Sequence, residues 1–319
     1  MTKAQTCPAC GEIGGPGAKW CEACGASIGP ACVDCGAGQD QIVDDYCGQC
    51  GRKQPGERDH LTEDSGKIVA VTDRGKRHHR NEDAFAIGTA GDILIAVVCD
   101  GVSTTDHPQD ASLAAAVAAR DVLVAAVESG QTDFEAALVE AVASAQGAAA
   151  AVPRIVGGEG PASTTFVATI VVPADDGVRT WTAWLGDSRA YWLHDGLGGG
   201  VTQLTTDDSW ALDQIASGAL GEDEAHADPR AQSITRWLGA DAVGAQPSIQ
   251  VFEHDPGGSL LSCSDGLWKY VPTESELSDL LGSLGASVEP SKMETAEALV
   301  NFANERGGHD NTTVVIATP

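Results

Sequence analysis

The sequence predicts an α+β protein in which mostly antiparallel sheets form a sandwich, preceded by a small metal-binding module. Three observations carry this prediction. Strand-like runs and helix-like runs are segregated along the chain rather than alternating, which is typical of α+β folds. Eight of the ten cysteines lie within the first 50 residues. With 319 residues, 42% of them hydrophobic, the chain can bury one large core beside a small module.

The first module, residues 1–51, is defined by four C-x2-C pairs, and a glycine follows the second cysteine of each pair. Eight thiolates suffice for two closed tetrahedral zinc sites, and four thiolates per ion leave no position for water, so two structural Zn²⁺ ions are predicted. A disulfide framework is the alternative, but it needs an oxidising compartment and the chain shows no export signal. The eight ligands are Cys7, Cys10, Cys21, Cys24, Cys32, Cys35, Cys47 and Cys50.

This module resembles a double zinc ribbon. Each C-x2-C pair with its glycine forms one zinc knuckle. If knuckles that are neighbours in the sequence share an ion, the first four cysteines hold one ion and the last four hold the other; a crossed arrangement is the alternative. Many zinc ribbons bind nucleic acid, but Lys3 and Lys19 are the only basic residues before Arg52. The ribbon is therefore expected to bind a protein partner or to support the domain that follows.

Charge and hydropathy exclude several kinds of partner. A net charge of -27 and a pI near 4.4 disfavour nucleic acid and anionic membrane surfaces. The longest Ala/Val-rich run, after Asp110, is interrupted by Arg120 and Asp121, so no stretch reaches the roughly 18 apolar residues of a membrane span. We therefore expect a cytoplasmic protein with neither nucleic-acid nor membrane partners.

A polar linker is expected at residues 52–66, and strands and helices follow it in the order of the apolar patterns. The first strands are expected at "KIVAVTD", "DAFAIG" and "DILIAVVCD". Two amphipathic helices follow, from about Gln109 to Glu128 and from Phe134 to Ala145. The remaining elements are strands at "STTFVATIVV", "VRTWTAWLG", "RAYWLH" and "VTQLT", a polar helical insertion at 207–239, strands at "SIQVFE" and "SLLSCSD", a helix from about Lys292 to Glu305, and the strand "TTVVIAT".

Several carboxylates lie where apolar strands begin or end. Glu82 and Asp83 precede "AFAI", Asp100 follows "ILIAVVC", Asp265 follows "SLLSCS", and Asp310 precedes "NTTVVIA". Any one of them is most simply a turn residue, but carboxylates clustered at buried strand ends require compensating cations. Carboxylate and carbonyl oxygens suit Mg²⁺ or Mn²⁺ better than zinc. Two such ions about 4 Å apart would activate a bridging water for in-line attack on phosphorus.

The order of these segments resembles the bacterial form of the metal-dependent protein phosphatase 2C (PPM) family. The matching motifs are "DRGKRHHRNEDAF", "VVCDGVS", "STTFVATIV", "AWLGDSRAYWL", "ITRWLG", "LLSCSDGLW" and "GGHDNTTVV". The resemblance implies a phosphatase domain at residues 67–319 with four layers, two antiparallel sheets flanked by helices, and a flap at 207–239. It implies a hydrolase that removes phosphate from phosphoserine and phosphothreonine proteins, using a water bridged between two Mn²⁺ or Mg²⁺ ions.

The resemblance also assigns the metal ligands. Asp100 would bridge the two ions, and Glu82 and the carbonyl of Gly101 would bind one of them. Asp265 and Asp310 would bind the other ion.

Two further carboxylates receive roles from the same resemblance. Asp187 of "GDSRAY" would hold a third, weaker ion together with Asp265. Asp83 would order metal-bound water.

The chain departs from the family pattern in two places. Family members usually have D-G-x-G-G, and this chain has "DGVST" at 100–104, so the loop takes another path without the glycine pair. The usual phosphate-binding arginine is replaced by His78. Either Arg77 or Arg80 substitutes for it through a shifted loop, or phosphate binding rests more on the metals. Arg77, His78 and Arg80 are the three candidate contacts for the substrate phosphate. His78 is either a general acid or a surface histidine.

Two other functions remain open. The first is a weakly active or inactive phosphatase-like regulator that binds phosphoproteins, which the altered loops permit. The second is a scaffold that recruits partners through the zinc ribbon.

Overall fold

In a computed structural model the chain divides into two compact units, Met1–Glu57 and Arg58–Pro319. The structure describes residues 6–319 except 8, 16, 17, 19, 27, 29–31, 34, 44, 195–198, 244 and 286–290. Each unit is described by itself below. In the described part of the chain, no helix is both long enough and apolar enough to cross a membrane.

The first unit is built around its cysteines. A 3₁₀ turn, η1 (Gln39–Gln41), leads into two short antiparallel strands, β1 (Ile42–Val43) and β2 (Tyr46–Cys47). Two small apolar clusters form, one around Cys7 and Cys21 and the other around Cys32 and Cys47. So small a core provides little hydrophobic stabilisation.

The second unit contains two large sheets in which all neighbouring strands are antiparallel. The first sheet has the order β11-β10-β14-β15-β4-β3, and the second has the order β13-β9-β8-β6-β5. The first comprises β3 (His60–Asp64), β4 (Ile68–Asp73), β10 (Arg189–Leu193), β11 (Val201–Gln203), β14 (Ser259–Cys263) and β15 (Thr312–Ala317). The second comprises β5 (Ala84–Ala90), β6 (Ile93–Cys99), β8 (Phe166–Ala174), β9 (Gly177–Leu185) and β13 (Ser248–His254).

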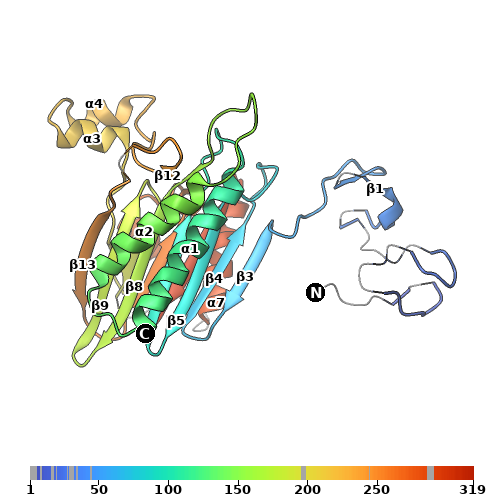
Figure 1. The fold of residues 1–319 in the computed structure, drawn as a ribbon, viewed down its shortest axis with the longest axis horizontal. Helices are drawn as coiled ribbons and strands as arrows, with labels where there is room; N and C mark the ends of the chain where they lie inside the picture. Colours follow the sequence, from blue (N-terminus) through green and yellow to red (C-terminus); the bar gives the residue numbers. More distant parts are fainter. Residues whose placement is uncertain are drawn as a thin grey trace. The chain divides into compact units, whose positions relative to one another are not determined.

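Three apolar clusters separate four layers. One cluster lies between the two sheets and includes Ile68, Leu94 and Trp192. A second packs α1 (Pro108–Glu128) and α2 (Phe134–Ala150) on the five-stranded sheet, and Figure 1 shows both helices crossing its face. The third packs α6 (Glu274–Gly285) and α7 (Lys292–Glu305) on the six-stranded sheet. The predicted sandwich of two antiparallel sheets flanked by helices is confirmed.

Local sequence signals set the ends of the helices. Asp133 caps α2 by accepting a hydrogen bond from the backbone of Ala136. Ser291 and Glu294 form a reciprocal capping box at the start of α7. The insertion at 207–239 contains α3 (Trp210–Ala216) and α4 (Glu222–Ala227), and its end forms β12 (Leu238–Gly239), which pairs with β7 (Ser163–Thr164). The expected helical content of the insertion is present.

Two expectations need correction. The prediction of a polar linker at 52–66 is wrong for His60–Asp64, because these residues form the edge strand β3. All five residues of β3 are exposed, and backbone pairing with β4 holds the strand, so no apolar period marks it. Helix α6 is not among the predicted elements, although Leu277 and Leu281 are buried one helical turn apart.

Candidate metal centre

Carboxylates from separate strand ends converge in the second unit. Asp100 follows β6, Asp265 follows β14, and Asp310 precedes β15. The pKa of Asp100 lies well above its usual value, chiefly because the group is buried and further because of the negative charges of Asp83, Asp265, Asp310 and Asp187. Five carboxylates, which together span more than 200 residues of the sequence, therefore share one electrostatic environment.

The loop after β6 depends on a glycine at position 101. A Cβ atom there would lie 2.7 Å from the carbonyl oxygens of both Glu82 and Pro108. The close approach lets the N–H of Gly101 donate to Glu82 O at 3.2 Å. Asp100 is fixed as well, since its N–H donates to the hydroxyl of Thr165 at 3.0 Å. Asp100, Gly101 and Glu82 are thus held together by the backbone.

Asp83 is buried, and only one of its two carboxylate oxygens has hydrogen-bond partners. Its Oδ2 accepts hydrogen bonds from Ser264 at 2.7 Å and Thr313 at 2.8 Å. Its Oδ1 is buried and has no hydrogen-bond partner. Burial raises the pKa of Asp83 to about 7, although the two hydroxyl groups lower it. An unpaired buried carboxylate oxygen is costly unless a cation or water meets it.

The basic loop from Arg77 to Arg80 meets the carboxylates from one side. His78 Nε2 lies 3.1 Å from Asp310 Oδ1, and its Nδ1 lies 3.8 Å from Glu82 Oε2. The hydrogen bond to Asp310 is the main reason why the pKa of His78 is raised. Arg80 Nε donates to Glu82 Oε1 at 3.0 Å, while the side chain of Arg80 is 51% exposed. Arg77 is exposed on the same loop.

Asp265 and Asp187 lie near the positively charged side chain of Lys269. The ammonium of Lys269 contacts Asp265 Oδ2. Asp265 Oδ1 is buried without a hydrogen-bond partner. Burial raises the pKa of Asp187 to about 7, and the charge of Asp265 adds to the rise.

The donor set fits hard divalent cations. Its members are carboxylates and one backbone carbonyl, and two buried oxygens, on Asp83 and Asp265, lack partners. The carboxylates are gathered loosely: among the described residues, only cysteines form groups of three or more ligand atoms within 4.8 Å of one another. The basic side chains of His78, Arg80 and Lys269 balance the carboxylates instead.

Two residues of this region carry no role in the sequence prediction. Asn311 is 2% exposed, accepts a hydrogen bond from the N–H of Glu82 at 2.8 Å, and donates to the carbonyls of Arg74 and Arg80. Ser103 donates to Glu82 Oε2 at 2.5 Å. The amide of Asn311 follows a predicted ligand directly, which is the one sequence signal that points to it.

The first unit groups its cysteines as neighbouring knuckles and not in the crossed arrangement. Cys7, Cys10, Cys21 and Cys24 form one cluster, and Cys32, Cys35, Cys47 and Cys50 form the other. Sulfur atoms of facing knuckles are 3.5 to 3.7 Å apart. Four sulfurs around a tetrahedral zinc ion, with Zn–S bonds of about 2.3 Å, would be separated by about 3.8 Å. The geometry therefore suits one zinc ion per cluster.

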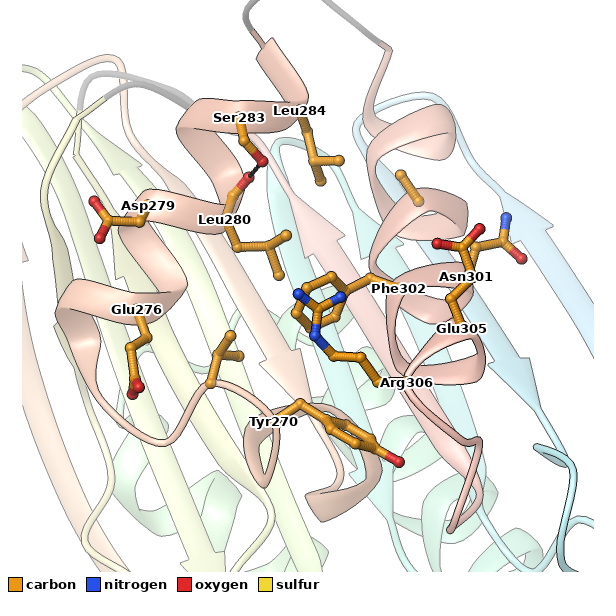
Figure 2. A pocket seen from close by; sticks show the side chains of 12 residues that line it. Tyr270, Glu276, Asp279, Leu280, Ser283, Leu284, Asn301, Phe302, Glu305 and Arg306 are labelled. Carbon is orange, nitrogen blue, oxygen red and sulfur yellow. Dashed lines mark hydrogen bonds between the residues drawn. The ribbon is translucent and has the colours of Figure 1, made fainter.

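Two hollows lie outside the carboxylate cluster or at its edge. A groove of about 720 Å³ runs between α6 and α7, and Figure 2 shows its apolar floor around Leu280 and Phe302. None of its twelve lining residues is a predicted site residue. A second hollow of about 480 Å³ lies between Asp187 and the insertion, where His226 of α4 lines it. The second hollow therefore adjoins the candidate centre.

Comparison with known proteins identifies similar chains. The sequence profile of Protein phosphatase 2C matches residues 72–303. Serine/threonine protein phosphatase PstP of Mycobacterium tuberculosis is 30% identical over 256 residues, which cover 79% of this chain and 44% of that protein. Serine/threonine phosphatase stp of Listeria welshimeri is 33% identical over 153 residues, covering 48% of this chain and 55% of that protein. The chain thus spans less than half the length of PstP.

Solved structures agree with these matches. The crystal structure of the Mycobacterium tuberculosis phosphatase PstP/Ppp aligns with a TM-score of 0.56 at 30% identity, covering 79% of this chain and 97% of that one. The PstP catalytic domain in complex with two manganese ions aligns with a TM-score of 0.55 at 30% identity, covering 79% of this chain and 96% of that one.

Proposed function

The chain belongs to the protein phosphatase 2C family, and from this membership we propose that it is a serine/threonine phosphoprotein phosphatase dependent on Mn²⁺ or Mg²⁺. The convergence of Asp100, Asp265 and Asp310 from three strand ends is the observation that supports the proposal most directly. Its substrates would be phosphoserine and phosphothreonine proteins.

The residues divide between two ions. Glu82 and the carbonyl of Gly101 would hold one, Asp265 and Asp310 the other, and Asp100 would serve both. When bound, such ions supply Lewis-acid activation of water and of the phosphoryl group. The protein's own part is to hold the carboxylates in place and to keep Asp265 Oδ1 free of other partners.

Arg77 and Arg80 are the proposed contacts for the substrate phosphate. Both lie on the basic loop, Arg77 is exposed, and Arg80 reaches Glu82 through Nε while half of its side chain stays accessible. Guanidinium groups suit a phosphate because they donate two parallel hydrogen bonds. His78, bound to Asp310, would position that carboxylate rather than clamp phosphate.

Mn²⁺-dependent turnover of a phosphothreonine peptide tests this function. Asp100→Asn and Asp265→Asn should each lower kcat/KM by at least about 100-fold, a loss of roughly 2.7 kcal/mol of transition-state stabilisation. Asp121→Asn, an exposed change on α1, is the matched control and should keep full activity. Full Mn²⁺-dependent activity in Asp100→Asn would show that the proposed centre is wrong.

The ribbon is proposed to bind two structural Zn²⁺ ions and to contact a protein partner. Trp20 and Tyr46 each immediately precede the third cysteine of their own cluster, and they are 52% and 45% exposed. Exposed aromatic side chains in matching positions favour protein contact. Eight thiols arranged for zinc also support a reducing compartment, and hence a cytoplasmic location.

The recruiting role has its own test. Trp20→Ser and Tyr46→Ser in the full chain should leave turnover of a short phosphopeptide unchanged but slow the dephosphorylation of phosphoproteins in a cell extract. Equal rates on extract proteins would contradict recruitment by the ribbon. Phosphopeptide binding without any Mn²⁺-dependent turnover would instead favour the inactive regulator.

A further inference from the structure

Lys269 is fixed against a proposed metal ligand by one helical turn. Lys269 is the C-cap of the short helix α5 (Asp265–Trp268), and its N–H donates to the carbonyl of Asp265 at 3.0 Å. Residues four apart in a helix share one face. The ammonium of Lys269 accordingly contacts Asp265 Oδ2. The spacing of one helical turn thus brings the two side chains together.

The ammonium of Lys269 borders the carboxylate cluster, and the side chain of Lys269 is 38% exposed. Burial alone would lower the pKa of Lys269, but the charges of Asp265, Asp310 and Asp187 raise it above its usual value. These three carboxylates are the expected ligands of the second and third metal ions. The indole N–H of Trp268 donates to the carbonyl of Asp187 at 2.8 Å, which ties α5 to the loop that carries Asp187.

Asp265 can serve two cations at once. Its Oδ2 is taken by Lys269, whereas its Oδ1 is buried without a hydrogen-bond partner. One oxygen is therefore available to the dinuclear centre while the other remains on the ammonium. A third divalent ion bound through Oδ2 would have to displace Lys269, and it would meet the positive charge of that ammonium at close range.

We propose that the ammonium of Lys269 takes the place of the third divalent ion, so that the phosphatase unit binds two such ions rather than three. This inference rests on the proposed function, because it presupposes a dinuclear centre at Asp100. The expected third ion between Asp187 and Asp265 does not fit a site that already contains a tethered cation. A lysine supplies its charge permanently and needs no free metal.

Counting bound metal tests the proposal without an activity assay. The full chain would be dialysed to equilibrium against millimolar Mn²⁺, and Mn and Zn would be counted separately per chain by mass spectrometry of the elements. We expect two Mn²⁺ in the wild type and in Lys269→Arg, which keeps the charge. Lys269→Met keeps the length of the side chain but loses the charge, and it should bind a third Mn²⁺. That third ion should be lost again in the double variant Lys269→Met/Asp187→Asn.

Each possible count of bound Mn²⁺ either supports or overturns the proposal. Three Mn²⁺ in the wild type, or only two in a Lys269→Met protein with a native circular dichroism spectrum, would overturn the role of Lys269. Lys269→Gln provides a second neutral variant if Lys269→Met does not fold. Fewer than two Mn²⁺ in the wild type would overturn the dinuclear centre itself, and with it both this inference and the proposed function.

Discussion

The hydroxyl of Ser103 donates a hydrogen bond to Oε2 of Glu82 across 2.5 Å. The other oxygen of Glu82 accepts from Arg80 Nε at 3.0 Å, so two different loops orient this carboxylate. Ser103 stands in the segment "DGVST", where the family usually has a pair of glycines. In this chain, a loop that departs from the family pattern therefore contacts a proposed metal ligand directly.

Replacing Ser103 should therefore weaken metal binding. Hydrogen bonds that orient a ligand typically change metal affinity by about 10- to 100-fold, and we expect Ser103→Ala to raise the Kd for Mn²⁺ about 10-fold in isothermal titration calorimetry. Ser103→Thr keeps the hydroxyl and should restore most of the affinity. Thr104→Ala, at the exposed neighbouring position, should have no effect. An unchanged Kd in Ser103→Ala would show that the contact does not matter for the metal.

Asn311 should be essential to the shape of the centre. Its side chain accepts from the N–H of Glu82 and donates to the carbonyls of Arg74 and Arg80, and it is 2% exposed. Asn311→Ala leaves these buried groups unpaired, at a cost of about 1–3 kcal/mol in the free energy of unfolding. Urea denaturation measures the loss. Asn301→Ala, on the exposed face of α7, is the control and should change stability by less than about 0.5 kcal/mol.

The sequence predicts the layers of this fold well because strands and helices have different apolar periods. Helix α7 and strand β15 occur where the sequence predicts them, and a β-branched run marks β15. Edge strand β3 escaped prediction because backbone pairing alone holds its exposed residues. Such a strand has no side-chain pattern to detect.

In the candidate site, too, some residues can be predicted from the sequence and others cannot. Carboxylates at strand ends can be recognised because each follows or precedes an apolar run, and Asp100 and Asp265 are examples. Ser103 and Lys269 could not be assigned from the pattern, since their roles depend on side-chain directions across loops and one helical turn. Contacts between residues 21 positions apart, as for Ser103 and Glu82, leave no periodic trace.

Zinc content should follow the two cysteine clusters independently. We expect two Zn²⁺ per chain in the wild type and one in either Cys21→Ser or Cys47→Ser, because each change opens one cluster of four thiolates. A colorimetric zinc assay on unfolded protein measures this count. Cys263→Ser alters a buried thiol of β14 and should retain both ions. Retention of two ions in Cys21→Ser would contradict the grouping of the cysteines.

His254 should make the second unit less stable in mild acid. Its ring stacks on Trp192 with centroids 4.0 Å apart, and its Nε2 lies 2.9 Å from the hydroxyl of Thr180. Burial, and secondarily the charge of His194, lower the pKa of His254 to about 4. His254 lines a surface hollow, and the charged side chains beside it there are Asp176, Arg179, Glu253 and Asp255.

The direction of the pH effect follows from that pKa. Above about pH 6.5 the ring is neutral in both folded and unfolded chains, so it adds no pH dependence. Between about pH 6.5 and pH 4 the unfolded chain binds a proton that the folded chain rejects, and the free energy of unfolding falls. Comparing Tm at pH 7.5 and pH 5 should show a smaller drop in His254→Gln than in the wild type. His226→Gln, an exposed histidine of α4, should keep the wild-type drop, and equal drops in all three proteins would rule out a contribution from His254.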